Sequence, residues 1–145
     1  PEGVGEPWFD TVESLLSHMI FSIPAVKGIE FGAGFAISDM RGSEANDPMR
    51  IENGKIVTVT NNSGGINGGI TNGMPVVFRC AMRPASSIAK EQKTVDFRNM
   101  QEVNLSISGR HDPCNVRRAV PVVEAAAALT VLDIMLSSDK GWKLI

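Results

Sequence analysis

The chain contains the run RAVPVVEAAAALTVLDIML at residues 118–136. The run predicts a long helix that is apolar on nearly all sides, so neighbouring elements must cover it on more than one side. Consecutive alanines from Ala125 to Ala128 would let the backbones of those neighbours approach closely. Pro121 fits this helix in the first turn, where its missing N–H group is not needed. The run therefore predicts a layered structure with this helix inside it.

The segment before this helix places three reactive side chains in a row. Gly109-Arg110-His111-Asp112-Pro113-Cys114 follows residues 103–107, whose alternation predicts a strand. On an extended segment, Arg110 and Asp112 would share one side while His111, a proton carrier near neutral pH, points to the other. Alternatively, Asp112 would cap the helix and His111 would be a hydrogen-bonded core residue. The residues alone leave both interpretations open.

A second segment with reactive side chains is Met82-Arg83-Pro84-Ala85-Ser86-Ser87-Ile88. A predicted strand ends here in a cation, followed by two hydroxyl groups in a turn set by proline. Arg83 could bind a phosphate bidentately while Ser86 and Ser87 donate to its remaining oxygens. The alternative is an exposed strand end with a serine turn. Arg117 and Arg118, downstream, are predicted to be solvated or paired with carboxylates.

A third segment, residues 63–69, is rich in glycine. Closely spaced glycines allow backbone amides to converge on a phosphate or a flat cofactor. The segment lacks the Lys-Ser/Thr of a P-loop, and Gly32-x-Gly34 nearby has no third glycine, so both nucleotide-binding fingerprints fail. Residue types alone therefore favour a tight structural turn over a ligand loop.

The rest of the chain predicts a mixture of helix and short strands. Asp10 and Glu13 form a capping box for an amphipathic helix, and Asn53-Gly54 is a strong hairpin signal. The predicted elements are a helix over 8–19, two short strands within 26–37, a loop over 39–50, a hairpin that includes 55–60, and a strand over 74–82.

Composition excludes several classes of protein. The chain has 14 Lys plus Arg and 16 Asp plus Glu, so no net positive charge attracts nucleic acid. Cys80 and Cys114 lie far apart without a metal-binding spacing, which predicts a reducing compartment, no metal site and no disulfide. No secretory signal precedes the first helix, so the cytoplasm is expected. The stretch 119–132 contains Glu124 and is too short to span a membrane.

Several longer strings, taken together, resemble chorismate synthase and occur in that family's order. The chain begins at Pro1 without an initiator Met, and it is expected to be the carboxyl-terminal fragment of a larger chain. The matching strings are Gly5-Glu6-Pro7, residues 21–28, 32–35, 42–44 with 46–47, 61–65, 69–70 with 72–75, Arg110-His111-Asp112-Pro113-Cys114 and 118–125.

The resemblance implies a carbon–oxygen lyase that converts 5-enolpyruvylshikimate 3-phosphate to chorismate by 1,4-elimination of phosphate, in aromatic amino acid biosynthesis. It implies reduced FMN as cofactor, used without net oxidation. It also implies an α+β fold with antiparallel sheets layered around a helical centre, as in the family's β-α-β sandwich, and a homotetramer. Residues 1–145 would be one domain that lacks the amino-terminal part of the enzyme and is inactive alone.

The resemblance also assigns roles to individual residues. Asp112 corresponds to the carboxylate that assists proton movement near the flavin, and Arg110 could also balance substrate anions. His111 does not match the family's catalytic histidines, which lie outside these residues. The flavin contacts would be Pro24, Ala25, Gly68, Arg83, Pro84, Ala85, Ser86, Ser87 and Arg110.

Two positions depart from the family pattern. Asn67 stands where an apolar residue is common, and Arg83 stands where lysine is usual, which changes the shape of the cation but keeps its charge. Two alternatives to the enzyme remain. One is a non-catalytic module that binds flavin or phosphate, or serves assembly, on the same scaffold. The other is an unrelated phosphate-sugar enzyme that shares only the glycine loops.

Overall fold

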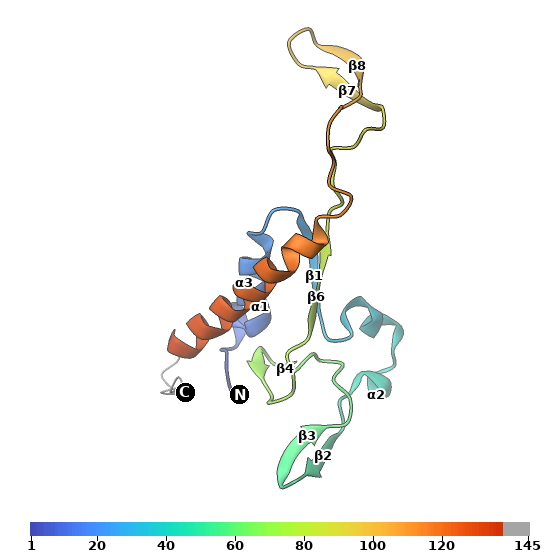
Figure 1. The fold of residues 1–145 in the computed structure, drawn as a ribbon. Coiled ribbons are helices and arrows are strands. Elements are labelled where there is room, and N and C mark those ends of the chain that lie inside the picture. The colour runs from blue at the N-terminus through green and yellow to red at the C-terminus, as the bar shows by residue number, and fades with distance from the viewer. Residues whose placement is uncertain (138–145) are drawn as a thin grey trace.

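The computed structural model describes residues 1–137. Figure 1 shows a body of helices and small sheets from which one hairpin projects. The elements in chain order are η1 (Trp8–Asp10), α1 (Val12–Phe21), β1 (Val26–Phe31), η2 (Gly34–Asp39), α2 (Gly42–Ala45), β2 (Met49–Glu52), β3 (Lys55–Thr58), β4 (Ile66–Asn67), β5 (Ile70–Thr71), β6 (Phe78–Met82), β7 (Gln92–Asp96), β8 (Gln101–Leu105) and α3 (Val116–Ser137), where η marks a 3-10 helix.

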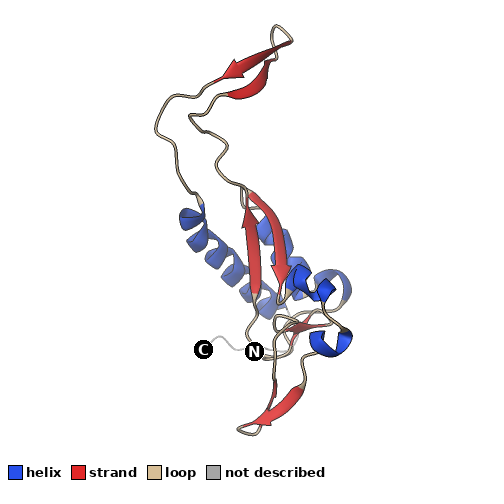
Figure 2. Ribbon diagram, turned by 90° about the vertical axis from the view of Figure 1, so that its right-hand side faces the viewer, coloured by secondary structure: helices blue, strands red, loops and turns tan. Residues whose placement is uncertain are grey.

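The body is organised around the antiparallel pair β1–β6, against which α1 and α3 pack. The register runs from Val26 opposite Met82 to Phe31 opposite Phe78. Each of the other sheets is also a two-stranded antiparallel pair, namely β2–β3, β4–β5 and β7–β8. Figure 2 shows the strands beside the two long helices. The predicted α+β fold class is confirmed.

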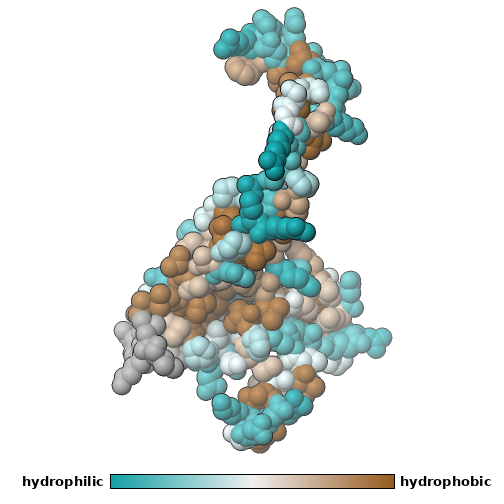
Figure 3. All heavy atoms as spheres, in the orientation of Figure 1, coloured by the Kyte–Doolittle hydropathy of each residue, from teal (hydrophilic) through white to brown (hydrophobic). Residues whose placement is uncertain are grey.

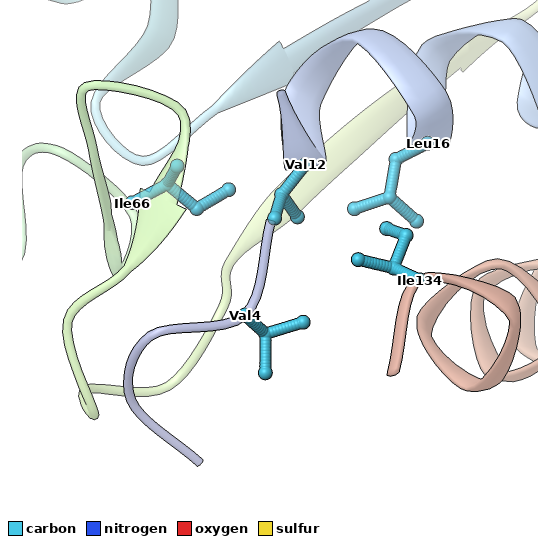
Figure 4. Packing of buried hydrophobic residues seen from close by; sticks show 5 residues of the cluster. All are labelled: Val4, Val12, Leu16, Ile66 and Ile134. Atoms are coloured by element: carbon cyan, nitrogen blue, oxygen red, sulfur yellow. The ribbon is translucent and has the colours of Figure 1, made fainter. Parts of the chain in front are cut away.

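Two clusters of buried side chains hold the helices to the strands. One joins Ile20 of α1, Val26 of β1 and Ala126 of α3. Each fully buried aliphatic side chain stabilises such a cluster by roughly 1.5–3 kcal/mol. The other cluster, shown in Figure 4, consists of Val4, Val12, Leu16, Ile66 and Ile134.

The long helix predicted over 118–136 is confirmed, but it is longer and less covered than expected. Because α3 begins at Val116, Pro121 lies beyond the first turn. Only one stripe, made of Ala126, Thr130 and Ile134, is buried. Its large apolar residues that remain at least one-third exposed are Val116, Val120, Val122, Leu129, Leu132 and Leu136. Figure 3 shows this apolar surface along the helix.

By length and composition, α3 also meets the requirement for a membrane span, with 22 residues and a mean hydropathy of 1.9. The prediction that this region is too short rested on residues 119–132 alone, and the helix extends beyond them at both ends. A core helix of a soluble protein passes the same test. The exposed Glu124 and Asp133 interrupt the apolar sequence.

The amino-terminal helix begins later than predicted. Trp8 belongs to the 3-10 turn η1 and is 83% exposed. The residue that caps α1 is Thr11 rather than Asp10, because its extended backbone lets Oγ1 accept a hydrogen bond of 3.0 Å from the Ser14 N–H. The predicted capping box of Asp10 and Glu13 is therefore wrong.

The second strand predicted within 26–37 is also wrong. After β1 the chain turns at Gly32, whose φ of 56° suits glycine, and continues as the 3-10 helix η2. A Cβ at Gly32 would lie 2.0 Å from the Asn62 carbonyl oxygen, so this turn also requires the close approach that glycine permits. The predicted loop over 39–50 contains the short helix α2, in which the Glu44 carboxylate accepts a 2.8 Å hydrogen bond from the Arg41 N–H.

The hairpin predicted at Asn53-Gly54 is confirmed as β2–β3. Both turn residues have positive φ, 52° and 75°, as expected for the turn that matches the twist of a tight hairpin. The strand predicted over 74–82 is limited to β6. Strand β8 lies near its predicted position at 103–107, whereas its partner β7 was not predicted.

Candidate functional site

Three segments that carry predicted site residues meet where β1 begins and β6 ends. The Arg83 N–H donates to the Ala25 carbonyl at 2.7 Å, next to the pair of Val26 and Met82. The Asn115 side-chain amide donates to the Arg83 carbonyl at 3.4 Å. The segments 24–25, 83–87 and 110–115 therefore converge near the first turn of α3. We call this region the junction site.

His111 joins two of these segments by hydrogen bonds from both ring nitrogens. Its Nε2 lies 3.0 Å from the Ile107 carbonyl oxygen, which can only accept, so Nε2 carries the proton. In the neutral imidazole, Nδ1 is then the acceptor for the Ser87 hydroxyl at 3.3 Å. His111 is half-buried. Of the two interpretations of His111 from the sequence, the hydrogen-bonded residue agrees better with the structure, although His111 lies outside the core clusters.

Asp112 forms an ion pair with Arg118, in the first turn of α3. The predicted pairing of Arg118 with a carboxylate is therefore confirmed. Asp112 does not cap the helix, because α3 begins only at Val116. Both side chains are substantially exposed, so the pair contributes about 0–1 kcal/mol to stability. Its main effect is to hold the Asp112 carboxylate against the start of the helix.

Arg83 and Arg110 supply positive charge to the junction site. Both are exposed, and within residues 1–137 neither forms an ion pair. Ser86 and Ser87 add hydroxyl donors on an exposed segment. Unpaired guanidinium groups together with hydroxyl groups form a donor set that suits a phosphate dianion.

Gly68 lies apart from the junction site. It belongs to the turn between β4 and β5, and the carbonyl of the next residue, Gly69, accepts a 3.0 Å hydrogen bond from the Val12 N–H at the start of α1. Ala25 follows the other end of α1, which has 10 residues and spans about 15 Å. Within one chain, Gly68 is therefore separated from the other predicted site residues by roughly the length of this helix.

The glycine-rich segment holds an anion from the chain itself, which the sequence did not predict. The two oxygens of Asp47 accept hydrogen bonds from the Asn62 N–H at 2.7 Å and the Ser63 N–H at 2.8 Å. The Thr60 hydroxyl donates to the same carboxylate at 2.8 Å. Burial acts to raise the pKa of Asp47, but these hydrogen bonds outweigh it and the pKa is lowered.

Comparisons with known proteins agree on one family. The chorismate synthase family model matches residues 1–136. The chain is 53% identical over 136 residues to the chorismate synthase of Archaeoglobus fulgidus, covering 94% of this chain and 38% of that protein. It is 53% identical over 141 residues to the enzyme of Chitinophaga pinensis, covering 97% of this chain and 42% of the relative.

A solved structure described as a crystal structure of chorismate synthase is also similar, with a TM-score of 0.72 and 31% identity. The alignment covers 94% of this chain and 34% of the solved one. The chain thus spans roughly two-fifths of the length of the relatives that it matches.

Proposed function

The chain belongs to the chorismate synthase family, and on this premise we propose that it supplies part of an active site for the 1,4-elimination of phosphate from 5-enolpyruvylshikimate 3-phosphate. The product of this lyase reaction is chorismate. Because the chain spans 38% of the Archaeoglobus fulgidus relative, the remaining catalytic groups would come from an amino-terminal part of the enzyme. The fragment alone would be inactive.

The observation that carries this proposal is the convergence at the junction site. Residues far apart in the sequence, Ala25, Arg83 and Asn115, are joined there by hydrogen bonds of 2.7 and 3.4 Å. The same segments carry Arg83 and Arg110, which have no ion-pair partner within residues 1–137. They also carry the hydroxyl groups of Ser86 and Ser87. A doubly anionic cofactor or substrate is the ligand that such groups stabilise best.

The donor set fits the phosphate of flavin mononucleotide, the cofactor that the family resemblance implies. Arg83 would bind the phosphate through its guanidinium group, with Ser86 donating to another oxygen and Ser87 donating once its hydroxyl proton is released from His111. Pro24, Ala25, Pro84, Ala85 and Arg110 would line the same site, with Gly68 as a further contact. Bound reduced flavin supplies electron density as the phosphate of the substrate leaves.

Asp112 is proposed as the carboxylate that accepts or passes a proton near the flavin. Its ion pair with Arg118 places it beside the first turn of α3. Arg110, two residues before it, would balance the negative charge of the substrate. The pair His111–Ser87 holds the two segments at a constant separation. The chain thus contributes binding, orientation and one proton-handling group.

We further propose that the complete enzyme is a cytoplasmic homotetramer. The exposed apolar side of α3 supports an assembly, because residues such as Leu129 and Leu136 are 58% and 60% exposed. Large apolar patches on a soluble protein mark interaction surfaces. A neighbouring element from the rest of the enzyme or from another copy would cover this side.

A hybrid enzyme tests the proposed function. Residues 1–136 of this chain would replace the aligned segment of the Archaeoglobus fulgidus chorismate synthase, and chorismate formation would be measured anaerobically with reduced FMN. We expect activity, and a loss of at least about tenfold for Asp112→Asn and for Arg110→Ala. Asp39→Asn, at an exposed aspartate outside the junction site, is the matched control and should not change the rate.

The same assay separates the enzyme from a non-catalytic module. A hybrid that binds reduced FMN and substrate but forms no chorismate would favour the module. Unchanged turnover in the Asp112 and Arg110 variants would show that the site residues are assigned wrongly, whatever the activity of the hybrid.

A further inference from the structure

The sequence left two interpretations of the glycine-rich segment, a loop that binds a ligand such as a phosphate and a structural turn. In the structure, the amides at the start of this segment bind the carboxylate of Asp47. We propose that Asp47 is a positioning residue for the flavin site, which fixes residues 61–66 and through them Gly68. This inference rests on the proposed function, because Gly68 contacts the flavin only under that proposal. Asp47 itself would not touch the cofactor.

The backbone of the segment is arranged as an anion-binding nest. The successive N–H groups of Asn62 and Ser63 point at the two carboxylate oxygens of Asp47, at 2.7 and 2.8 Å. Such nests of consecutive amides normally bind phosphates or other anions. Here the nest is filled by the chain itself, so a ligand phosphate has no vacant amides at these two residues.

Further hydrogen bonds hold the region from which Asp47 comes. The Asn62 side-chain amide donates to the carbonyl oxygens of Glu44 and Ala45, at 3.2 and 3.3 Å. Thr60, just before the nest, donates to Asp47 from the other side. The carboxylate is thus fixed by both the segment that carries it and the segment that it binds.

The position of the nest is transmitted to Gly68 through tightly packed backbone. Gly64 and Gly65, which follow the nest, are buried, and an added Cβ at either would lie 2.5 Å from backbone atoms of Gly32 or Pro75. Ile66, next along the chain, is 3% exposed and belongs to a core cluster. A displacement at Asn62 therefore cannot be absorbed before it reaches strand β4.

The turn at Gly68 is also held from α1, because the Gly69 carbonyl accepts the 3.0 Å hydrogen bond from the Val12 N–H. The surroundings of Gly68 itself are open, with no atom within 4 Å of an added Cβ. On the far side, the Asn72 amide donates to Gly65 at 2.9 Å and its side chain to Asn67 at 2.6 Å. The turn is thus held at its base, and Asp47 fixes one side of that base.

The test measures FMN affinity and steady-state kinetics of the hybrid enzyme with Asp47→Asn. Asparagine keeps the shape of aspartate but places an NH₂ group against a backbone N–H, so one hydrogen bond is lost and the charge is removed. We expect FMN to bind more weakly, by at most about tenfold, because Asp47 acts on the flavin only through Gly68 and cannot transmit more than the energy of one charge-assisted hydrogen bond. The control Asp39→Asn makes the same chemical change at an exposed aspartate and should leave affinity unchanged.

A second measurement detects the contact without any variant. In the 145-residue chain, the amide proton resonances of Asn62 and Ser63 should titrate together, with a midpoint below the ordinary aspartate pKa.

A purely structural role would lower the stability of Asp47→Asn but leave the FMN dissociation constant of its folded fraction unchanged.

The outcomes are distinguishable. Weaker FMN binding, by up to about tenfold, in Asp47→Asn but not in Asp39→Asn supports the inference. Equal FMN affinity in wild type and Asp47→Asn, or Asn62 and Ser63 resonances that do not titrate, would overturn it and leave the proposed function standing. If the unmodified hybrid binds no FMN while the Archaeoglobus fulgidus enzyme does, the proposed function fails, and the role of Asp47 in flavin binding fails with it.

Discussion

Replacing Leu16 by alanine should strongly destabilise the contact between α1 and α3. Leu16 is 1% exposed and packs in one cluster with Val12 and Ile134. The substitution removes three carbon groups at about 0.8 kcal/mol each, or about 2.4 kcal/mol. The cavity left behind raises the expected loss in the free energy of unfolding to about 3 kcal/mol.

Urea denaturation followed by circular dichroism measures this loss. The midpoint should fall at unchanged slope, since the surface exposed on unfolding stays nearly the same. Leu129→Ala is the matched control, because this leucine lies on α3 but is 58% exposed, and it should change stability by less than about 0.5 kcal/mol. Equal losses in the two variants would refute the packing of α3 described above.

Three further predictions concern single contacts. The low pKa of Asp47 means that its carboxylate stabilises the fold above the unfolded aspartate value of about 3.9 and loses this effect as pH falls through the folded value. The difference in unfolding free energy between wild type and Asp47→Asn should therefore be constant above about pH 5 and shrink below about pH 4, and a difference that grew on acidification would contradict the hydrogen bonds. Arg118→Gln should lower the free energy of unfolding by less than about 1 kcal/mol, because the pair with Asp112 is exposed. Thermal melts should show a smaller loss in high salt, which screens the pair. Gly54→Ala should destabilise the β2–β3 hairpin by about 1 kcal/mol, since its φ is 75°, and unchanged amide exchange in β2 and β3 would argue against this turn.

The sequence predicted the elements whose signals are local. The Ala- and Leu-rich run gave α3 to within a few residues of its ends, and Asn53-Gly54 located the first hairpin because a turn of that type needs positive φ at both positions. Strand β7 was missed because residues 92–96 are mostly polar and remain largely exposed in the structure. A strand that packs against no core does not need alternating apolar residues, so its sequence lacks that signal.

Contacts between distant segments could not be read from residue types. Gly32 ends β1 because the Asn62 carbonyl oxygen lies against it, 30 residues away in the chain. The filling of the glycine-rich nest by Asp47 depends on the same packing. Likewise, the family resemblance assigned Gly68 and Ala25 to one site without showing that α1 lies between them. For Arg118, the residue type indicated a side chain that is either solvated or paired with a carboxylate, and the structure shows the pair.

Arg83 and Arg110 are both proposed to contact the flavin at the junction site, Arg83 through the phosphate. FMN titration of the hybrid enzyme with Arg83→Ala, Arg110→Ala and the exposed control Arg117→Ala tests these contacts most directly. Affinity should fall by about tenfold or more for Arg83→Ala and for Arg110→Ala, with the larger loss at low salt, and should stay unchanged for Arg117→Ala. Equal affinity in all of these variants would contradict the assignment of the junction site.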